Sequence, residues 1–220
     1  MAQRTVHYLF GELLLREVPV ADAPRFLLGS LLPDAFVSRE DRDTTHFAVK
    51  TADRSWLDYD AFYDRFGGLV REDPLYLGYY MHLFEDDGYR RIMHGKYYDR
   101  FTLTSDADLE ALYRDYTILN GVIKREFGLS SRLGETPRDD NAKRLYTAIA
   151  PLDPEEMKKA LARDFSCDLE GELRFLTFDI LREYLDEWLP AGVRQMEAIL
   201  GGERGVPAES FAWRKRARYN

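Results

Sequence analysis

The sequence predicts an all-α fold. Apolar residues recur at the three- and four-residue spacing of helices almost throughout the 220 residues, and no segment alternates strictly between apolar and polar side chains. The composition, 45% hydrophobic and 32% charged, is that of a globular chain long enough to bury a sizeable core. We therefore expect a single domain over residues 1–220, built as a multi-helix bundle around one buried central helix.

Two helices are expected in the N-terminal part of the chain. Val6, Leu9 and Leu13 share one face of the first helix. The second helix begins after Asp22, where an aspartate can cap it, and ends near Pro33.

The segment that follows is polar and irregular over residues 37–51, which places His46 in a loop. A third helix is expected over residues 56–66. Gly67 and Gly68 are expected to end it, because glycine is a poor helix former.

The clearest helix start in the chain is Asp73 followed by Pro74, an N-cap residue followed by proline at the first helical position. Residues 75–84 are almost all apolar or aromatic and leave no polar face. A helix of this kind is surrounded by others, so we expect it to be the central helix of the bundle.

Later helix boundaries follow from the same signals. Ser105 caps a long helix that Gly128 stops, and Asp153–Pro154 begins another. Residues 169–200 form one or two helices with a break at Pro190, because proline removes a backbone donor.

Two segments are candidates for irregular structure. The polar, turn-rich residues 130–141 are expected to link helices of the same domain. The basic residues 212–220 are expected to be a solvated tail, with weak contact to an anionic surface as the alternative.

Charge and composition narrow the classes of function. The formal net charge of −8 disfavours a stable nucleic-acid partner, because such binding depends on neutralising phosphates. We expect no transmembrane segment, since no apolar run approaches the ~20 residues that span a bilayer. The single Cys167 cannot form an internal disulfide, and Glu12 interrupts the apolar N-terminal segment that a signal peptide would need, so we expect a cytoplasmic protein.

The chain contains only four histidines, and one of them lies in the central helix four residues before an aspartate. On a helix, His82 and Asp86 share one face, one turn apart, so both can reach a single metal ion. Zinc accepts both imidazole nitrogen and carboxylate oxygen. A buried histidine–aspartate hydrogen bond would also satisfy both groups, and the spacing alone favours that structural interpretation.

Three further residues shift this balance towards a metal site. His7 lies in the apolar first helix without an acidic residue three or four positions away, and Asp34 ends the segment "GSLLPD" after the second helix. His46 follows in "TTHF". The alternatives are a turn residue for Asp34 and an exposed loop residue for His46.

Together these segments resemble the zinc-dependent phospholipase C family, whose fold is shared with single-strand-specific nucleases, and in particular its small bacterial members. The matching positions are His7, residues 29–34, residues 45–47 and residues 78–86, the last of which read "GYYMHLFED". They cover about the first 90 residues of the chain.

The resemblance implies a ligand set. One zinc ion would be held by Asp34, His46, His82 and Asp86, and Asp86 would bridge to a second ion that His7 also binds. Asp34 would in addition be the catalytic residue that orients or deprotonates a water molecule. One or two ions are expected, with another divalent metal as an alternative to zinc.

The chain departs from the family in two places. The family's second metal also takes the free amine of a processed N-terminus, and Met1 and Ala2 lie closer to His7 than the family spacing allows. The family's third metal needs histidines that do not occur here after His94.

Three residues are therefore expected beside the metal rather than on it. They are Asp87, Arg90 and His94, as candidates for supporting the ligands or contacting the substrate.

The function expected from these residues is that of a metal-dependent hydrolase acting on a small phosphoester. Phospholipids, nucleotides and other esters remain open as substrates. A non-catalytic helical protein that retains a structural metal or a bare polar cluster is the alternative. A nucleotide phosphohydrolase of the His-Asp type is disfavoured, because no histidine of the chain is followed directly by aspartate.

Overall fold

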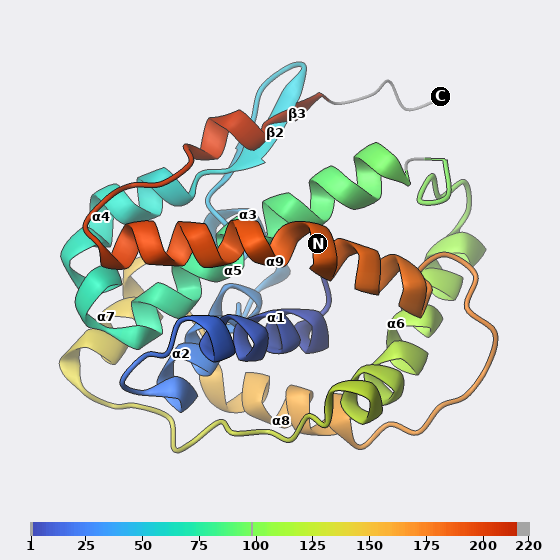
Figure 1. Ribbon diagram of the computed structural model, residues 1–220, viewed down its shortest axis with the longest axis horizontal. Helices are drawn as coiled ribbons and strands as arrows, with labels where there is room; N and C mark the ends of the chain where they lie inside the picture. The colour runs from blue at the N-terminus through green and yellow to red at the C-terminus, as the bar shows by residue number, and fades with distance from the viewer. Residues whose placement is uncertain (1, 98, 215–220) are drawn as a thin grey trace.

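The computed structural model describes residues 2–97 and 99–214, which are mainly helical (Figure 1). The expected all-α fold is confirmed. The helices are α1 (Arg4–Glu17), α2 (Ala23–Gly29), α3 (Arg42–Thr45), α4 (Tyr59–Glu72), α5 (Pro74–Arg91), α6 (Asp106–Phe127), α7 (Asp140–Ala148), α8 (Pro154–Phe165) and α9 (Phe178–Leu200). None of the helices in the described residues is long and apolar enough to span a membrane.

Helix α5 is the central helix that the sequence predicts. The side chain of Asp73 accepts a hydrogen bond from the backbone N–H of Leu75 at 3.0 Å, and Pro74 is the first helical residue. Every residue from 75 to 89 is buried. The helix packs against α1, α2, α4 and α9, so its polar side chains must find partners inside the protein.

Helices α2 and α5 cross with their backbones in contact at two glycines. A Cβ atom on Gly78 would lie 2.1 Å from the carbonyl oxygen of Phe26, and one on Gly29 would lie 2.1 Å from that of Leu75. Only glycine allows this approach. Ser30 follows Gly29, and the close crossing brings its carbonyl oxygen to the residue one turn beyond Gly78 on α5, which is His82.

A small antiparallel sheet is formed by strands β1 (Ala48–Lys50), β2 (Arg54–Leu57) and β3 (Trp213–Arg214) in the order β1-β2-β3. Val49 pairs with Trp56, and Ser55 pairs with Trp213. Residues 37–51 were expected to be irregular, which is wrong for β1 and for α3. These strands are too short for a two-residue alternation to be recognisable in the sequence.

The expected bounds of the third helix are also wrong. Helix α4 begins at Tyr59, where the Asp58 side chain accepts from the N–H of Ala61, and it continues through Gly67 and Gly68 to Glu72. Two glycines weaken a helix by about 1 kcal/mol each. The buried aromatic face of α4 against α5 outweighs that cost.

Helices α6 and α8 begin where the sequence predicts, whereas the helical segment expected from residue 169 begins only at Phe178. Ser105 caps α6, and Gly128 ends it in the left-handed conformation at φ 62°. Helix α7 was not expected and begins inside the segment predicted to be a linker, at Asp140. Helix α9 continues unbroken through Pro190, since buried residues on both sides of the proline pack against α1 and α5.

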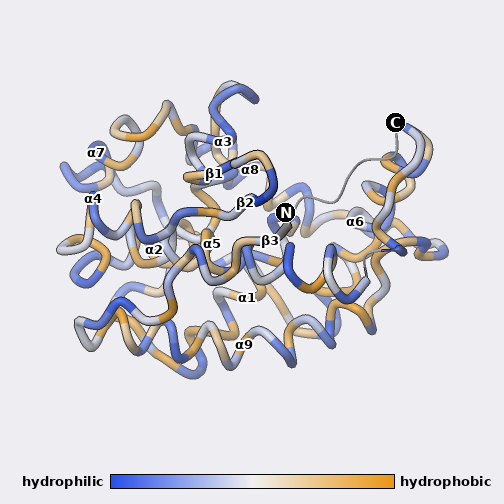
Figure 2. The backbone as a smooth tube through the Cα atoms, turned by 90° about the horizontal axis from the view of Figure 1, so that it is seen from above, coloured by the Kyte–Doolittle hydropathy of each residue, from blue (hydrophilic) through white to orange (hydrophobic). Residues whose placement is uncertain are grey.

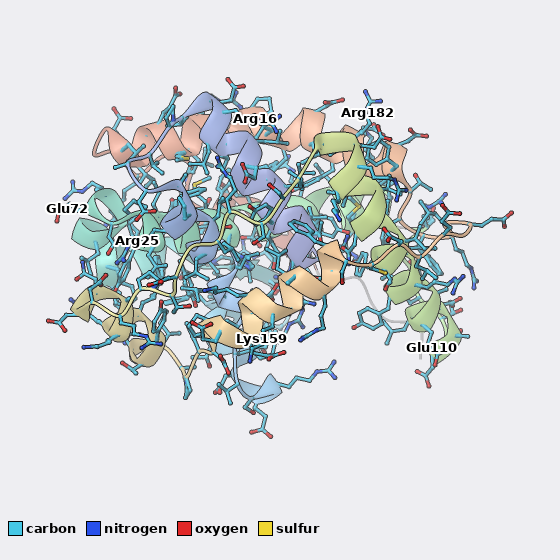
Figure 3. All side chains as sticks on the ribbon, turned by 90° about the horizontal axis from the view of Figure 1, so that it is seen from below. Arg16, Arg25, Glu72, Glu110, Lys159 and Arg182 are labelled. Atoms are coloured by element: carbon cyan, nitrogen blue, oxygen red, sulfur yellow. The ribbon has the colours of Figure 1, made fainter. Side chains whose placement is uncertain are left out.

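Hydrophobic and hydrophilic residues alternate along α9, as expected for a helix with one buried face (Figure 2). Charged side chains such as Glu72, Glu110 and Arg182 lie at the periphery of the molecule (Figure 3). Residues 215–220, most of the basic tail expected from the sequence, lie outside the described residues.

Candidate metal centre

Five side chains from separate parts of the chain converge in the interior: His7 on α1, Asp34 at the end of a 3₁₀ turn after α2, His46 directly after α3, and His82 and Asp86 on α5. The Nε2 atom of His46 lies 3.3 Å from Asp34 Oδ1 and 3.3 Å from His82 Nε2. His7 Nε2 lies 3.7 Å from Asp86 Oδ1 and 3.8 Å from Asp34 Oδ2. The structure therefore brings together all five of the metal ligands predicted from the sequence.

The three histidines are oriented by acceptors on their other ring nitrogen. His82 Nδ1 donates to the carbonyl oxygen of Ser30 at 2.8 Å, and His46 Nδ1 donates to that of Arg42 at 2.8 Å. A carbonyl oxygen can only accept, so each Nδ1 carries its proton and a neutral ring keeps a lone pair on Nε2. Metal-binding histidines are usually held in this way.

The partner of His7 is a residue that sequence reasoning missed. His7 Nδ1 donates to the Glu85 carboxylate, whose other oxygen accepts from the hydroxyl of Tyr184 at 2.7 Å. Glu85 is 1% exposed and directly follows residues 75–84, which leave no polar face. A carboxylate in that position needs a partner, which was a usable signal, but Tyr184 is 99 residues further along the chain and nothing local points to it.

Two atoms at the point of convergence lack hydrogen-bond partners among the described residues. They are His7 Nε2 and Asp86 Oδ2, and both are buried. A buried polar atom without a partner costs about 1–3 kcal/mol. Imidazole nitrogen and carboxylate oxygen are together the donor set that zinc accepts, so these residues fit a bound divalent cation.

The charges of the centre also suit a cation. Burial raises the pKa of the Asp34 carboxyl, but the adjacent imidazole groups outweigh burial and hold the pKa well below its usual range. Burial likewise raises the pKa of the Asp86 carboxyl, but the positive charges of neighbouring groups outweigh burial and lower this pKa to about 2. Both carboxylates are therefore ionised at neutral pH.

Two of the histidines differ in protonation. Burial lowers the pKa of His82 to about 3, so this ring is neutral. Burial would also lower the pKa of His7, but the adjacent Glu85 carboxylate outweighs it and raises the pKa to about 9. Without a metal, His7 is thus a cation held by Glu85.

Of the three residues expected to support the ligands or contact the substrate, His94 lines the same cavity as Asp34, whereas Asp87 and Arg90 do not. Both carboxylate oxygens of Asp87 accept from the backbone N–H of Leu57 in β2, at 2.9 and 3.1 Å, and burial raises the pKa of Asp87 to about 8. Arg90 Nη1 lies 4.0 Å from Asp87. His94, in a π-helical turn after α5, stacks on Trp213 with ring centroids 5.7 Å apart. None of these contacts orients a residue of the cluster.

A cavity of about 560 Å³ adjoins the cluster on the side of Asp34. Its wall is largely apolar and aromatic, and it includes Leu109 and Tyr113 of α6, which are 40% and 55% exposed. The Asp34 side chain is 15% exposed, whereas those of His7 and Asp86 are fully buried. Asp34 therefore connects the cluster with a space that is open to solvent.

Comparisons of the chain with protein-family models, with curated proteins and with solved structures found no match. The resemblance to zinc-dependent phospholipase C proteins stays a prediction from the quoted segments.

Proposed function

We propose that the protein is a metal-dependent hydrolase of small phosphoesters, with one or two zinc ions held by His7, Asp34, His46, His82 and Asp86. The observation that carries the proposal is the orientation of the three histidines. Each has its Nδ1 bound to an acceptor, so the three Nε2 atoms face the Asp34 and Asp86 carboxylates in a buried space.

When bound in such a site, zinc lowers the pKa of a water molecule to about 7 and polarises a phosphoryl oxygen. The protein's own contribution is to fix the ligands and to admit the substrate. Asp34 is the ligand that borders the cavity, where its carboxylate can accept a hydrogen bond from the attacking water. Because its pKa is so low, Asp34 is better suited to orienting that water than to removing its proton.

The alternative is a structural metal in a protein without catalytic activity. Structural zinc sites are closed by four protein ligands, whereas catalytic sites keep a position for water or substrate. The partial exposure of Asp34 and the adjoining cavity favour catalysis. A cytoplasmic location belongs to the same proposal and is supported by the single cysteine, which allows no internal disulfide.

The test begins with protein purified without chelator. We expect elemental analysis to find zinc or a similar metal, and we expect chelator treatment to lower the melting temperature and to abolish hydrolysis of p-nitrophenyl phosphate or bis(p-nitrophenyl) phosphate. Added zinc should restore both. Protein that holds no metal, and whose melting temperature and activity do not respond to zinc, would rule the proposal out. Bound metal that stabilises the protein without hydrolysis of either ester would favour the structural alternative.

A further inference from the structure

The cavity beside Asp34 contains two arginine side chains that differ in their partners. Arg4 is paired with Asp164, which also lines the cavity, by contacts of 3.0 Å from Nε and 3.4 Å from Nη2. The charge of Arg4 is thereby neutralised within the wall.

Arg42 is half-buried and also lines the cavity. Within residues 2–97 and 99–214, no carboxylate oxygen lies within 4.0 Å of its guanidinium. Its neighbour Asp43 pairs with Lys50 instead. The backbone carbonyl of Arg42 accepts the hydrogen bond from His46 Nδ1, so this cavity-lining residue is fixed to the candidate metal centre through its main chain.

The charge of the centre leaves a role for such a side chain. Asp34 and Asp86 bring two carboxylates to the candidate metal centre, and two carboxylates balance the charge of one divalent ion. A phosphoester brings at least one further negative charge, and a phosphomonoester brings nearly two at neutral pH. A guanidinium without a protein partner can hold phosphoryl oxygens with two parallel hydrogen bonds.

We infer that Arg42 binds the phosphoryl group of the substrate in the cavity and makes the site selective for anionic phosphoesters over neutral esters. This inference rests on the proposed hydrolase function. The arginine that the sequence suggested for contact with the substrate, Arg90, does not line this cavity. Arg90 lies beside Asp87, Arg91 lies over the ring of Phe211 at 5.8 Å, and neither lines the cavity that Asp34 borders.

The direct test is the binding of phenylphosphonate, whose P–C bond is not an ester and cannot be hydrolysed. Isothermal titration is made on protein loaded with stoichiometric zinc and no excess. The variant is Arg42→Gln, which keeps the backbone carbonyl that His46 requires. The matched control is Arg39→Gln, which removes the same charge three residues earlier, at an exposed position outside the cavity wall.

We expect Arg42→Gln to weaken phenylphosphonate binding about 10- to 100-fold, the range for losing hydrogen bonds to a charged group, and Arg39→Gln to leave it within about 2-fold. Arg42→Lys, which keeps the charge but lacks the planar fork, should recover part of the loss. Dissociation constants are compared only between proteins of equal zinc content. Equal affinity of wild type and Arg42→Gln would overturn the inference, as would an equal loss in Arg39→Gln or no binding by the wild type.

Kinetics separate this inference from the proposed function. If the protein hydrolyses p-nitrophenyl phosphate, Arg42→Gln should raise KM for that anion by a larger factor than it changes KM for neutral p-nitrophenyl acetate, and Arg39→Gln should raise neither. Hydrolysis of the phosphate with an unchanged KM in Arg42→Gln would sink the role of Arg42 and leave the hydrolase proposal standing. Arg42-dependent binding of phenylphosphonate without hydrolysis of any phosphoester would support the role of Arg42 and contradict the hydrolase proposal.

Discussion

His7 on α1 is held through Nδ1 by Glu85 on α5, and its unpaired Nε2 faces Asp34 and Asp86. This pair links α1 with α5 through two residues that are 78 positions apart in the sequence. A carboxylate behind a metal-binding histidine fixes the ring and makes its free nitrogen a stronger ligand.

The first prediction is that zinc affinity depends on pH through His7. Its pKa is about 9 without metal, so below that pH a proton must leave before zinc binds. The apparent affinity should therefore rise about tenfold per pH unit between pH 6.5 and 8. Competition with a chromophoric chelator across this range measures the slope. In Glu85→Gln the pKa of His7 should fall, because the charge that raised it is gone, and the slope should flatten; equal slopes in both proteins would contradict the assignment.

The second prediction concerns the histidine of the central helix. His82→Ala removes a candidate ligand, so its zinc affinity should fall by more than the roughly 10- to 100-fold typical of changes outside the ligand shell. His94→Ala is the matched control, since His94 stacks on Trp213 and takes no part in the cluster. Equilibrium dialysis followed by elemental analysis measures both. Unchanged zinc binding in His82→Ala would remove the residue from the site.

The third prediction concerns Tyr184, whose hydroxyl donates to Glu85 at 2.7 Å. Tyr184→Phe keeps the packing of the ring and removes this hydrogen bond, so Glu85 holds His7 less firmly. We expect zinc affinity to fall roughly 10-fold, within the range for an outer partner of a metal ligand. Tyr146→Phe should have no such effect, because the Tyr146 hydroxyl binds the carbonyl oxygen of Pro137. Equal zinc affinities in the two variants would count against the role of Tyr184.

The fourth prediction compares two glycines in neighbouring helices. Gly78→Ala would place a Cβ atom 2.1 Å from a backbone oxygen of α2, and it should lower the free energy of unfolding by at least about 1–3 kcal/mol. At Gly68, an exposed position in α4, a Cβ atom meets nothing within 4 Å. Gly68→Ala should raise the free energy of unfolding by about 0.5–1 kcal/mol.

Urea unfolding of both proteins checks the signs. A stabilising effect of Gly78→Ala would show that α2 and α5 do not cross as closely as described. Gly78→Ala should also weaken zinc binding, because separating the helices moves the Ser30 carbonyl away from His82.

Much of the fold follows from local signals in the sequence. The Asp73–Pro74 start and the unbroken apolar run after it identify α5 because capping and burial act on consecutive residues. Strands β1 and β2 could not be predicted because each has too few residues to show a two-residue alternation. Their stability comes from pairing with each other and from the contact of Asp87 with Leu57.

The candidate site, like the fold, could be predicted only in part from local signals in the sequence. His82 and Asp86 could be paired from helical spacing alone, whereas His7, Asp34 and His46 joined them only through a resemblance between short segments. The role of Glu85 could not be predicted, because its partners lie on helices that are distant in the sequence. Arg42 was missed because its isolation from carboxylates is a property of the folded wall and not of the polar segment that contains it.

The contact between Tyr184 and Glu85 has a consequence for the stability of the C-terminal helix. All five candidate ligands lie within the first 86 residues, yet one of them is buttressed by α9. Metal binding and local unfolding are thermodynamically linked. If the metal binds more tightly when α9 supports Glu85 and His7, then bound metal must in turn stabilise α9 against local unfolding. Slower amide hydrogen exchange around residue 184 on zinc binding would then report the occupancy of a site whose ligands are all more than ninety positions away.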